Sequence, residues 1–206
     1  MDIVIFVQSL KTEERIKIFD INKKTFPKLK IFQSINGYNI NETINELFKS
    51  KLKFKRLDFN TYGTLANFIT KVNAFKYQVE NNIEYMCLLE DDLILNDNFE
   101  IFLQGLLPKL KSYNMIRLCN WGEGYLTSIT GARNILTHIY NIGIIRNIDN
   151  QLRDNCGSEL YVQNTPFTLV VKSNEGDCLK TEKIFKWRLL RFNKRFPLWY
   201  KRFPLW

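Results

Sequence analysis

Short apolar runs of strand length alternate along this chain with longer segments whose apolar residues recur at helical spacing. The first run, residues 2–7, precedes Thr12-Glu13-Glu14, which supplies the cap and the acidic first turn typical of a helix start. The clearest helix is predicted over residues 63–82, where one stripe contains Leu65, Phe68, Ile69, Val72, Phe75 and Val79. Since parallel neighbours in a sheet need helical crossovers, the alternation predicts an α/β fold with a mostly parallel central sheet.

The remaining expected elements continue this pattern. Strands are expected near residues 29–32, 85–89, 115–119, 162 and 167–171, and helices near 44–48, 97–107 and 130–140. Asp97 with Glu100 is predicted to cap the second of these helices, and Gly143 is predicted to end the third. A chain of 206 residues that is 45% hydrophobic can bury one substantial core, so we expect a single domain over residues 1–180 and a separate tail over 181–206.

Three consecutive carboxylates, Glu90-Asp91-Asp92, follow directly after the apolar run 85–89. Adjacent carboxylates at the end of a buried strand repel one another unless a cation neutralises them, and a hard divalent metal does so. Because successive strand residues point to opposite faces, Glu90 and Asp92 are predicted to face one ion while Asp91 turns away toward a nucleotide ribose. Ligands of parallel sheets bind beyond the carboxyl ends of the strands, which is where these acids are expected. The alternative for such a triplet is a solvated acidic loop.

Neither a membrane span nor a zinc site is expected. No run approaches the roughly 18 to 20 apolar residues of a spanning helix, and the apolar start at residues 3–7 is too short for a signal sequence. The four cysteines, Cys87, Cys119, Cys156 and Cys178, form no CxxC pair. A chain with a full core does not require disulfides, which favours a reducing compartment and a cytoplasmic location.

Several short motifs occur in order between residues 1 and 175. They are Val7-Gln8-Ser9-Leu10 with Arg15, the turn at residues 34–37, Leu88-Leu89-Glu90-Asp91-Asp92, residues 125–132, Asn147-Ile148-Asp149 and Pro166. Their order and content resemble glycosyltransferase family 25, the lipopolysaccharide-type transferases, and the Leu-Glu-Asp-Asp signature at residues 89–92 is the most specific match. Ala66-Asn67-Phe68 departs from the family's Ser-His helix start, and Asn36 stands where the family usually has Asp.

The resemblance implies a GT-A type nucleotide-binding fold and a metal-dependent, inverting transfer of a hexose. The implied donor is a UDP-sugar, UDP-galactose or UDP-glucose, and the implied acceptor is a lipooligosaccharide or another glycan. A Mn²⁺ or Mg²⁺ ion is expected at Glu90 and Asp92, where it offsets the charge of the leaving diphosphate. Contacts with the nucleotide sugar are implied for Gln8, Leu10, Arg15 and Asp91.

Inversion also requires a base that takes the proton of the acceptor hydroxyl, and a carboxylate is the usual group. Asp149 is predicted to be this base, with Asp154 and Glu159 as nearby alternatives; a surface acid that caps a turn is the structural alternative for each of them. His138, the single histidine of the chain, is predicted to be structural because it lies beside the apolar stripe of a helix.

The C-terminal segment 181–206 is basic and aromatic. It contains eight of the chain's 30 Lys and Arg residues against Glu182 alone, so most of the net charge of +9 lies there. Aromatic residues are interleaved with these cations, and the hexapeptide Lys-Arg-Phe-Pro-Leu-Trp occurs twice. This composition predicts peripheral binding of residues 183–206 to an anionic membrane surface, the inner face of the cytoplasmic membrane. Binding of single-stranded nucleic acid fits the tail alone and gives the acidic triplet no role, so no nucleic-acid partner is expected.

Two other functions remain open for the acidic triplet. A metal-dependent phosphate-ester hydrolase also uses clustered carboxylates, although such sites usually gather more acids and histidines than this chain offers. A non-catalytic nucleotide-sugar binding module would differ from the transferase only in lacking the base.

Overall fold

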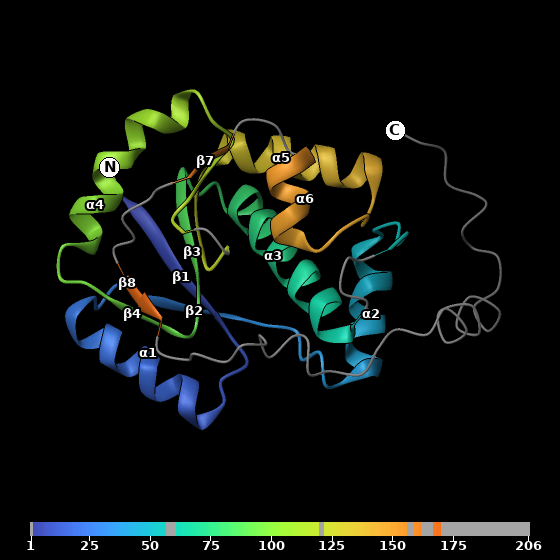
Figure 1. The fold of residues 1–206 in the computed structure, drawn as a ribbon, viewed down its shortest axis with the longest axis horizontal. Helices are drawn as coiled ribbons and strands as arrows, with labels where there is room; N and C mark the ends of the chain where they lie inside the picture. Colours follow the sequence, from blue (N-terminus) through green and yellow to red (C-terminus); the bar gives the residue numbers. More distant parts are fainter. Residues whose placement is uncertain (1, 57–60, 120–121, 156–158, 162–166, 170–206) are drawn as a thin grey trace.

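A six-stranded sheet forms the centre of the molecule (Figure 1). The structure is a computed structural model and describes residues 2–56, 61–119, 122–155, 159–161 and 167–169. The strands of the sheet, in spatial order, are β2 (Lys30–Gln33), β1 (Ile3–Ser9), β3 (Tyr85–Glu90), β6 (Gly124–Ser128), β5 (Met115–Arg117) and β7 (Glu159–Tyr161). Within this sheet only β6 runs against the common strand direction. The predicted α/β fold with a mostly parallel sheet is therefore confirmed.

Helices cover both faces of the sheet. On one face, α2 (Ile40–Ser50), α3 (Tyr62–Glu80), α5 (Ile129–Ile142) and α6 (Ile148–Asn155) share an apolar cluster with the strands. On the other face, α1 (Glu13–Thr25), α4 (Phe99–Leu106) and the 3-10 helix η1 (Leu107–Lys111) share a second cluster with them. A separate antiparallel pair, β4 (Leu93–Leu95) and β8 (Phe167–Leu169), joins the second layer, where the Asn22 side chain bonds the backbone of β4. The result is a layered sandwich of helices, sheet and helices.

Strand alternation decides which residues face α3. Phe6 of β1 and Leu88 of β3 belong to the cluster that contains α3, whereas the next residue in each strand, Val7 or Leu89, belongs to the opposite cluster. Two residues after Phe6 and Leu88 come Gln8 and Glu90, which are partners in the parallel register of β1 and β3. Side chains two apart on a strand share a face, so these two polar residues lie on the α3 side of the sheet at its carboxyl end.

Local capping explains the bounds of the longer helices. Thr61 caps α3 because its side chain accepts a hydrogen bond from the Thr64 amide, and Ser128 caps α5 in the same way through the Gly131 amide. Gly143, whose φ is +80°, ends α5 as predicted.

Four elements were not predicted from the sequence, and one predicted cap is wrong. The additional elements are β4, η1, β6 and α6, all short. The cap position of α4 is occupied by Asn98 and not by Asp97, and no side-chain cap bond forms there. β7 ends directly before residue 162, near which a strand was expected. Residue 162 itself and the tail over 181–206 lie outside the described residues. None of the described helices combines the length and the apolar character that a membrane-spanning helix needs.

Candidate active site

A pocket of about 440 Å³ opens at the carboxyl ends of β1, β2 and β3. Its lining includes Gln8, Leu10 and Arg15 from the end of β1 and the start of α1, and Glu90, Asp91 and Asp92 from the end of β3. The turn after β2 and the first turns of α3 complete the wall. All six residues that the sequence analysis assigned to the donor or its metal therefore meet at one pocket.

Gln8 joins three elements at the base of this pocket. Its side-chain amide nitrogen donates to Asn67 Oδ1 of α3 at 3.1 Å and to Glu90 Oε1 of β3 at 3.3 Å. The bond to Asn67 explains how a polar residue is accommodated on a helix that is otherwise packed in the core. Asn67 occupies the position where the family resemblance expects a serine. Its side-chain amide oxygen accepts the hydrogen bond from Gln8 of the sheet.

Asp91 and Asp92 lie in a turn, because β3 ends at Glu90. The strand conformation that was expected to extend through Asp92 therefore stops at Glu90. Arg15 Nε lies 3.6 Å from Asp91 Oδ1, and Arg15 NH1 lies 3.8 Å from Asp92 Oδ2, so one guanidinium group faces both acids. The three side chains are at most 19% exposed, which makes this a mostly buried charge cluster.

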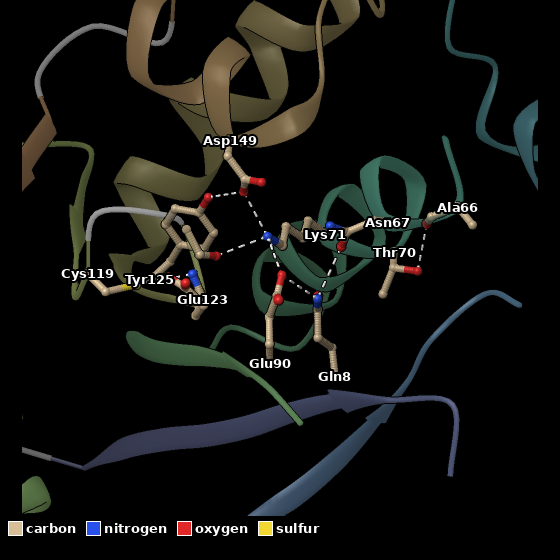
Figure 2. A network of polar contacts seen from close by, with 11 residues as sticks. Gln8, Ala66, Asn67, Thr70, Lys71, Glu90, Cys119, Glu123, Tyr125 and Asp149 are labelled. Carbon is tan, nitrogen blue, oxygen red and sulfur yellow. Dashed lines mark hydrogen bonds and ion pairs between the residues drawn. The ribbon is translucent and has the colours of Figure 1, made fainter. Parts of the chain in front are cut away.

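Lys71 is the functional candidate that the sequence analysis missed, because the segment 63–82 was interpreted only as a core helix. Its side chain is 1% exposed, and its Nζ lies 3.0 Å from Glu90 Oε1 and 2.8 Å from Asp149 Oδ1 (Figure 2). The signal in the sequence was its spacing: it comes three residues after Phe68 and four before Phe75, and a lysine on that buried face needs an anionic partner.

Asp149, the predicted base, lies in the first turn of α6 and does not line the donor pocket. The Tyr125 hydroxyl of β6 and Lys71 both donate to its Oδ1 atom. Figure 2 shows Lys71 between Asp149 on one side and Glu90 on the other. The structure thus connects the predicted base to the acidic triplet through one ammonium group.

The alternative acids and the histidine differ from Asp149 in their surroundings. Asp154 forms ion pairs with Arg146 and Arg153, which hold its pKa below the usual value. The side chain of Glu159 is outside what the structure describes. His138 is half-buried on α5, a helix packed on the core, and its structural role stays a prediction.

The family model for "Glycosyltransferase family 25 (LPS biosynthesis protein)" matches residues 2–147, which include every residue that lines the pocket. The chain belongs to glycosyltransferase family 25. A comparison with curated proteins gave no match. Among solved structures, one similar chain is a glycosyltransferase involved in the glycosylation of the major capsid of PBCV-1, with 9% sequence identity and a TM-score of 0.44. The similarity covers 84% of this chain and 95% of that one.

Burial and mutual repulsion destabilise the ionised carboxylates of this family 25 protein, and a nearby positive charge stabilises them. Burial raises the pKa of Glu90 to about 7; Lys71 opposes the rise, and Asp149 and Asp92 add to it. Burial also raises the pKa of Asp92, against the effect of Arg15. Burial lowers the pKa of Lys71, but the attraction of Asp149 and Glu90 outweighs this and raises the pKa above the usual value. Lys71 therefore remains charged at neutral pH.

The carboxylates fit a divalent cation that arrives with a phosphate ligand. Among the described residues, no group of three or more His, Cys, Asp and Glu side chains is arranged to hold a metal ion by itself. Asp92 Oδ1, however, is buried without a hydrogen-bond partner in the part of the chain that the structure describes. Magnesium-like cations usually take one or two carboxylates together with substrate phosphates, and carboxylates also suit Mn²⁺. The unpartnered Asp92 oxygen is therefore chemically compatible with a cation of this class.

Proposed function

We propose that this chain is a metal-dependent, inverting glycosyltransferase that moves galactose or glucose from a UDP-sugar to a lipooligosaccharide or another glycan. The observation that carries the proposal is the pocket at the carboxyl ends of β1 to β3, where Arg15 faces the carboxylates of Asp91 and Asp92 and Glu90 lines the same wall. Membership of family 25 makes glycosyl transfer the expected activity of that pocket. A GT-A type of nucleotide binding is part of the proposal, since ligands of such sheets bind beyond the carboxyl ends of the strands.

The pocket offers both signs of charge, which suits a diphosphate together with a counter-ion. We assign Arg15 to the diphosphate, because a guanidinium group can donate two parallel hydrogen bonds to phosphate oxygens. Asp91 is assigned to the ribose hydroxyls, and Gln8 and Leu10 to the wall that contacts the nucleotide sugar. A Mn²⁺ or Mg²⁺ ion held by Glu90 and Asp92 would neutralise charge on the leaving diphosphate.

Asp149 is assigned as the base of the transfer. The acceptor oxygen forms a bond to the anomeric carbon while the bond from that carbon to the diphosphate oxygen breaks, and the hydroxyl proton moves to the Asp149 carboxylate. Inversion places the acceptor and the leaving diphosphate on opposite sides of the anomeric carbon. A base outside the donor pocket but joined to it through Lys71 suits this requirement.

Calorimetric titration with a panel of nucleotide sugars, with and without Mn²⁺, tests the proposal. Wild type is expected to bind UDP-galactose or UDP-glucose in a Mn²⁺-dependent way. Asp92→Asn is expected to weaken that binding at least about tenfold, since contacts to charged groups contribute about 1.5–3 kcal/mol. Asp97→Asn is the matched control, because Asp97 is exposed and does not line the pocket. Binding indifferent both to Mn²⁺ and to Asp92→Asn would contradict the metal-dependent transfer proposed for this pocket.

The tail adds a proposed partner, an anionic membrane surface bound by residues 183–206. Cations draw such a segment to anionic lipid, and aromatic side chains hold it at the interface. Each basic residue near the surface contributes about 1 kcal/mol, so eight suffice for micromolar binding or better. Such binding would keep the enzyme at the cytoplasmic face, where a lipid-linked acceptor is anchored.

A further inference from the structure

Lys71 carries a charge in the middle of the apolar core. Phe68 and Phe75, one turn before and one turn after it on α3, are completely buried, and the Lys71 side chain is itself 1% exposed. A buried ammonium group is retained in a folded protein only where partners compensate both its charge and its hydrogen-bond donors. The partners of Lys71 therefore indicate its role.

The three N–H donors of Lys71 match three acceptors. Nζ lies 2.8 Å from Asp149 Oδ1, 3.0 Å from Glu90 Oε1 and 3.1 Å from the carbonyl oxygen of Gly122. An ammonium group has only three donors, so none remains for a bound substrate. Lys71 is also not among the residues that line the donor pocket. It therefore acts on the two carboxylates and not on the diphosphate.

The orientation of Asp149 depends on this contact. Lys71 and the Tyr125 hydroxyl both donate to Oδ1, and among the described residues no hydrogen bond is made to Oδ2. Gly122 permits the close approach, because a Cβ atom there would lie 2.5 Å from Asp149 Oδ1. Oδ1 is thus held in place, and Oδ2 remains available to accept a proton.

We propose that Lys71 is a positioning residue that fixes the Asp149 carboxylate relative to Glu90, and thereby relative to the donor pocket. This inference rests on the proposed function, in which Asp149 is the base. A displaced base lowers the rate of the chemical step, whereas donor affinity changes only through the contact of Lys71 with Glu90. The expected signature is a loss of kcat much larger than any change in the dissociation constant of the donor.

The variant Lys71→Met removes the charge and keeps an unbranched apolar side chain of similar length. In its crystal structure the Asp149 carboxylate is expected to leave its position, while Gln8 still contacts Glu90. Its kcat is expected to fall about 100-fold, the scale of a misplaced reacting group, and the dissociation constant of the donor is expected to change by less than about tenfold. Gln78→Met is the matched control, since Gln78 is a fully buried polar residue of the same helix that bonds Thr127 and the backbone of Ile83. It is expected to change stability but neither Asp149 nor kcat.

Two further variants complete the test. If Lys71→Met does not fold, Lys71→Arg keeps the charge but cannot place three donors at one point, so the same displacement of Asp149 and a smaller loss of kcat are expected. An unmoved Asp149 carboxylate with wild-type kcat in either variant overturns the inference. Asp149→Asn separates the positioning role of Lys71 from the proposed role of Asp149 as the base. If Asp149 is displaced in Lys71→Met but Asp149→Asn transfers sugar at the wild-type rate, the base assignment is wrong. The positioning contact between Lys71 and Asp149 then still stands.

Discussion

Cys87 is 0% exposed and Cys119 is 5% exposed, and this burial controls the reactivity of their thiols. Burial raises the pKa of both thiols, that of Cys119 to about 12, where a hydrogen bond to the Glu123 carboxylate adds to the rise. Because the thiolate is the reactive form, a raised pKa leaves little of it at pH 8. We expect iodoacetamide to modify these two cysteines at least about 100-fold more slowly in the native protein than in urea. Peptide mass spectrometry measures the rate at each cysteine, and equal rates in the two states would contradict this prediction.

The sequence predicted the carboxylates of the site, but it did not predict that Lys71 faces them. The acidic triplet at residues 90–92 identified the donor pocket, because a polar run directly after a buried strand marks the carboxyl end of that strand. A metal was expected to supply the compensating charge, yet Arg15 and Lys71 already face these acids. Lys71 could have been noticed as a cation on a buried helical face. Its partner Asp149 is 78 residues further along the chain, a distance that only the tertiary fold closes.

Two glycines in helices are expected to respond to alanine with opposite sign. A Cβ atom on Gly131 in the first turn of α5 would lie 1.8 Å from the backbone oxygen of Asn114, whereas one on Gly105 in α4 meets nothing within 4 Å. Gly131→Ala should therefore lower the free energy of unfolding by about 1–3 kcal/mol, the usual cost of overpacking. Gly105→Ala should raise it by about 0.4–1 kcal/mol, because alanine loses less backbone entropy.

Urea unfolding of the two variants and wild type measures both differences. A Gly131→Ala as stable as wild type would show that the packing of α5 against the segment before β5 is not as described, and a destabilised Gly105→Ala would show that the space beside Gly105 in α4 is not open.

Elements with strong periodicity were predicted, and short ones were not. The helix over 63–82 and the strand over 85–89 were identified from spacing and from an uninterrupted apolar run, and both are present as α3 and β3. β6 contains only two large apolar residues, and its antiparallel position between β3 and β5 is decided by pairing with them. The eight-residue α6 is mostly polar, so its apolar contacts, made by Ile148 and Leu152, were too few to give a periodic pattern.

At the scale of the whole molecule, charge is distributed unevenly between the body and the tail. Replacing the eight basic residues of 181–206 by Gln in the full-length protein is expected to abolish sedimentation with anionic vesicles. Donor binding should be unchanged, because the residues that line the pocket lie between Gln8 and Asp92. Vesicle pelleting at low and at high salt measures the first expectation, and calorimetry the second. Equal pelleting of the variant and wild type would exclude the tail as the membrane-binding segment.

The position of the pocket followed from topology more than from any single residue. Parallel strands bring their carboxyl ends to one edge, so the ends of β1, β2 and β3 meet although they are far apart in sequence. The sequence therefore predicted where the pocket lies and which residues at the ends of β1 and β3 line it. It pointed to Asp149 but not to its contacts with Tyr125 and Lys71, because neither α6 nor β6 was expected.

Anomalous diffraction at the manganese edge, from crystals grown with Mn²⁺ and UDP, tests the central claim most directly. The account predicts one manganese peak in the pocket, bonded to carboxylate oxygens of Glu90 and Asp92 and to oxygens of the diphosphate, with the Arg15 guanidinium beside the phosphates. UDP bound in that pocket without manganese, or manganese bonded elsewhere while Glu90 and Asp92 keep only their protein partners, would contradict it.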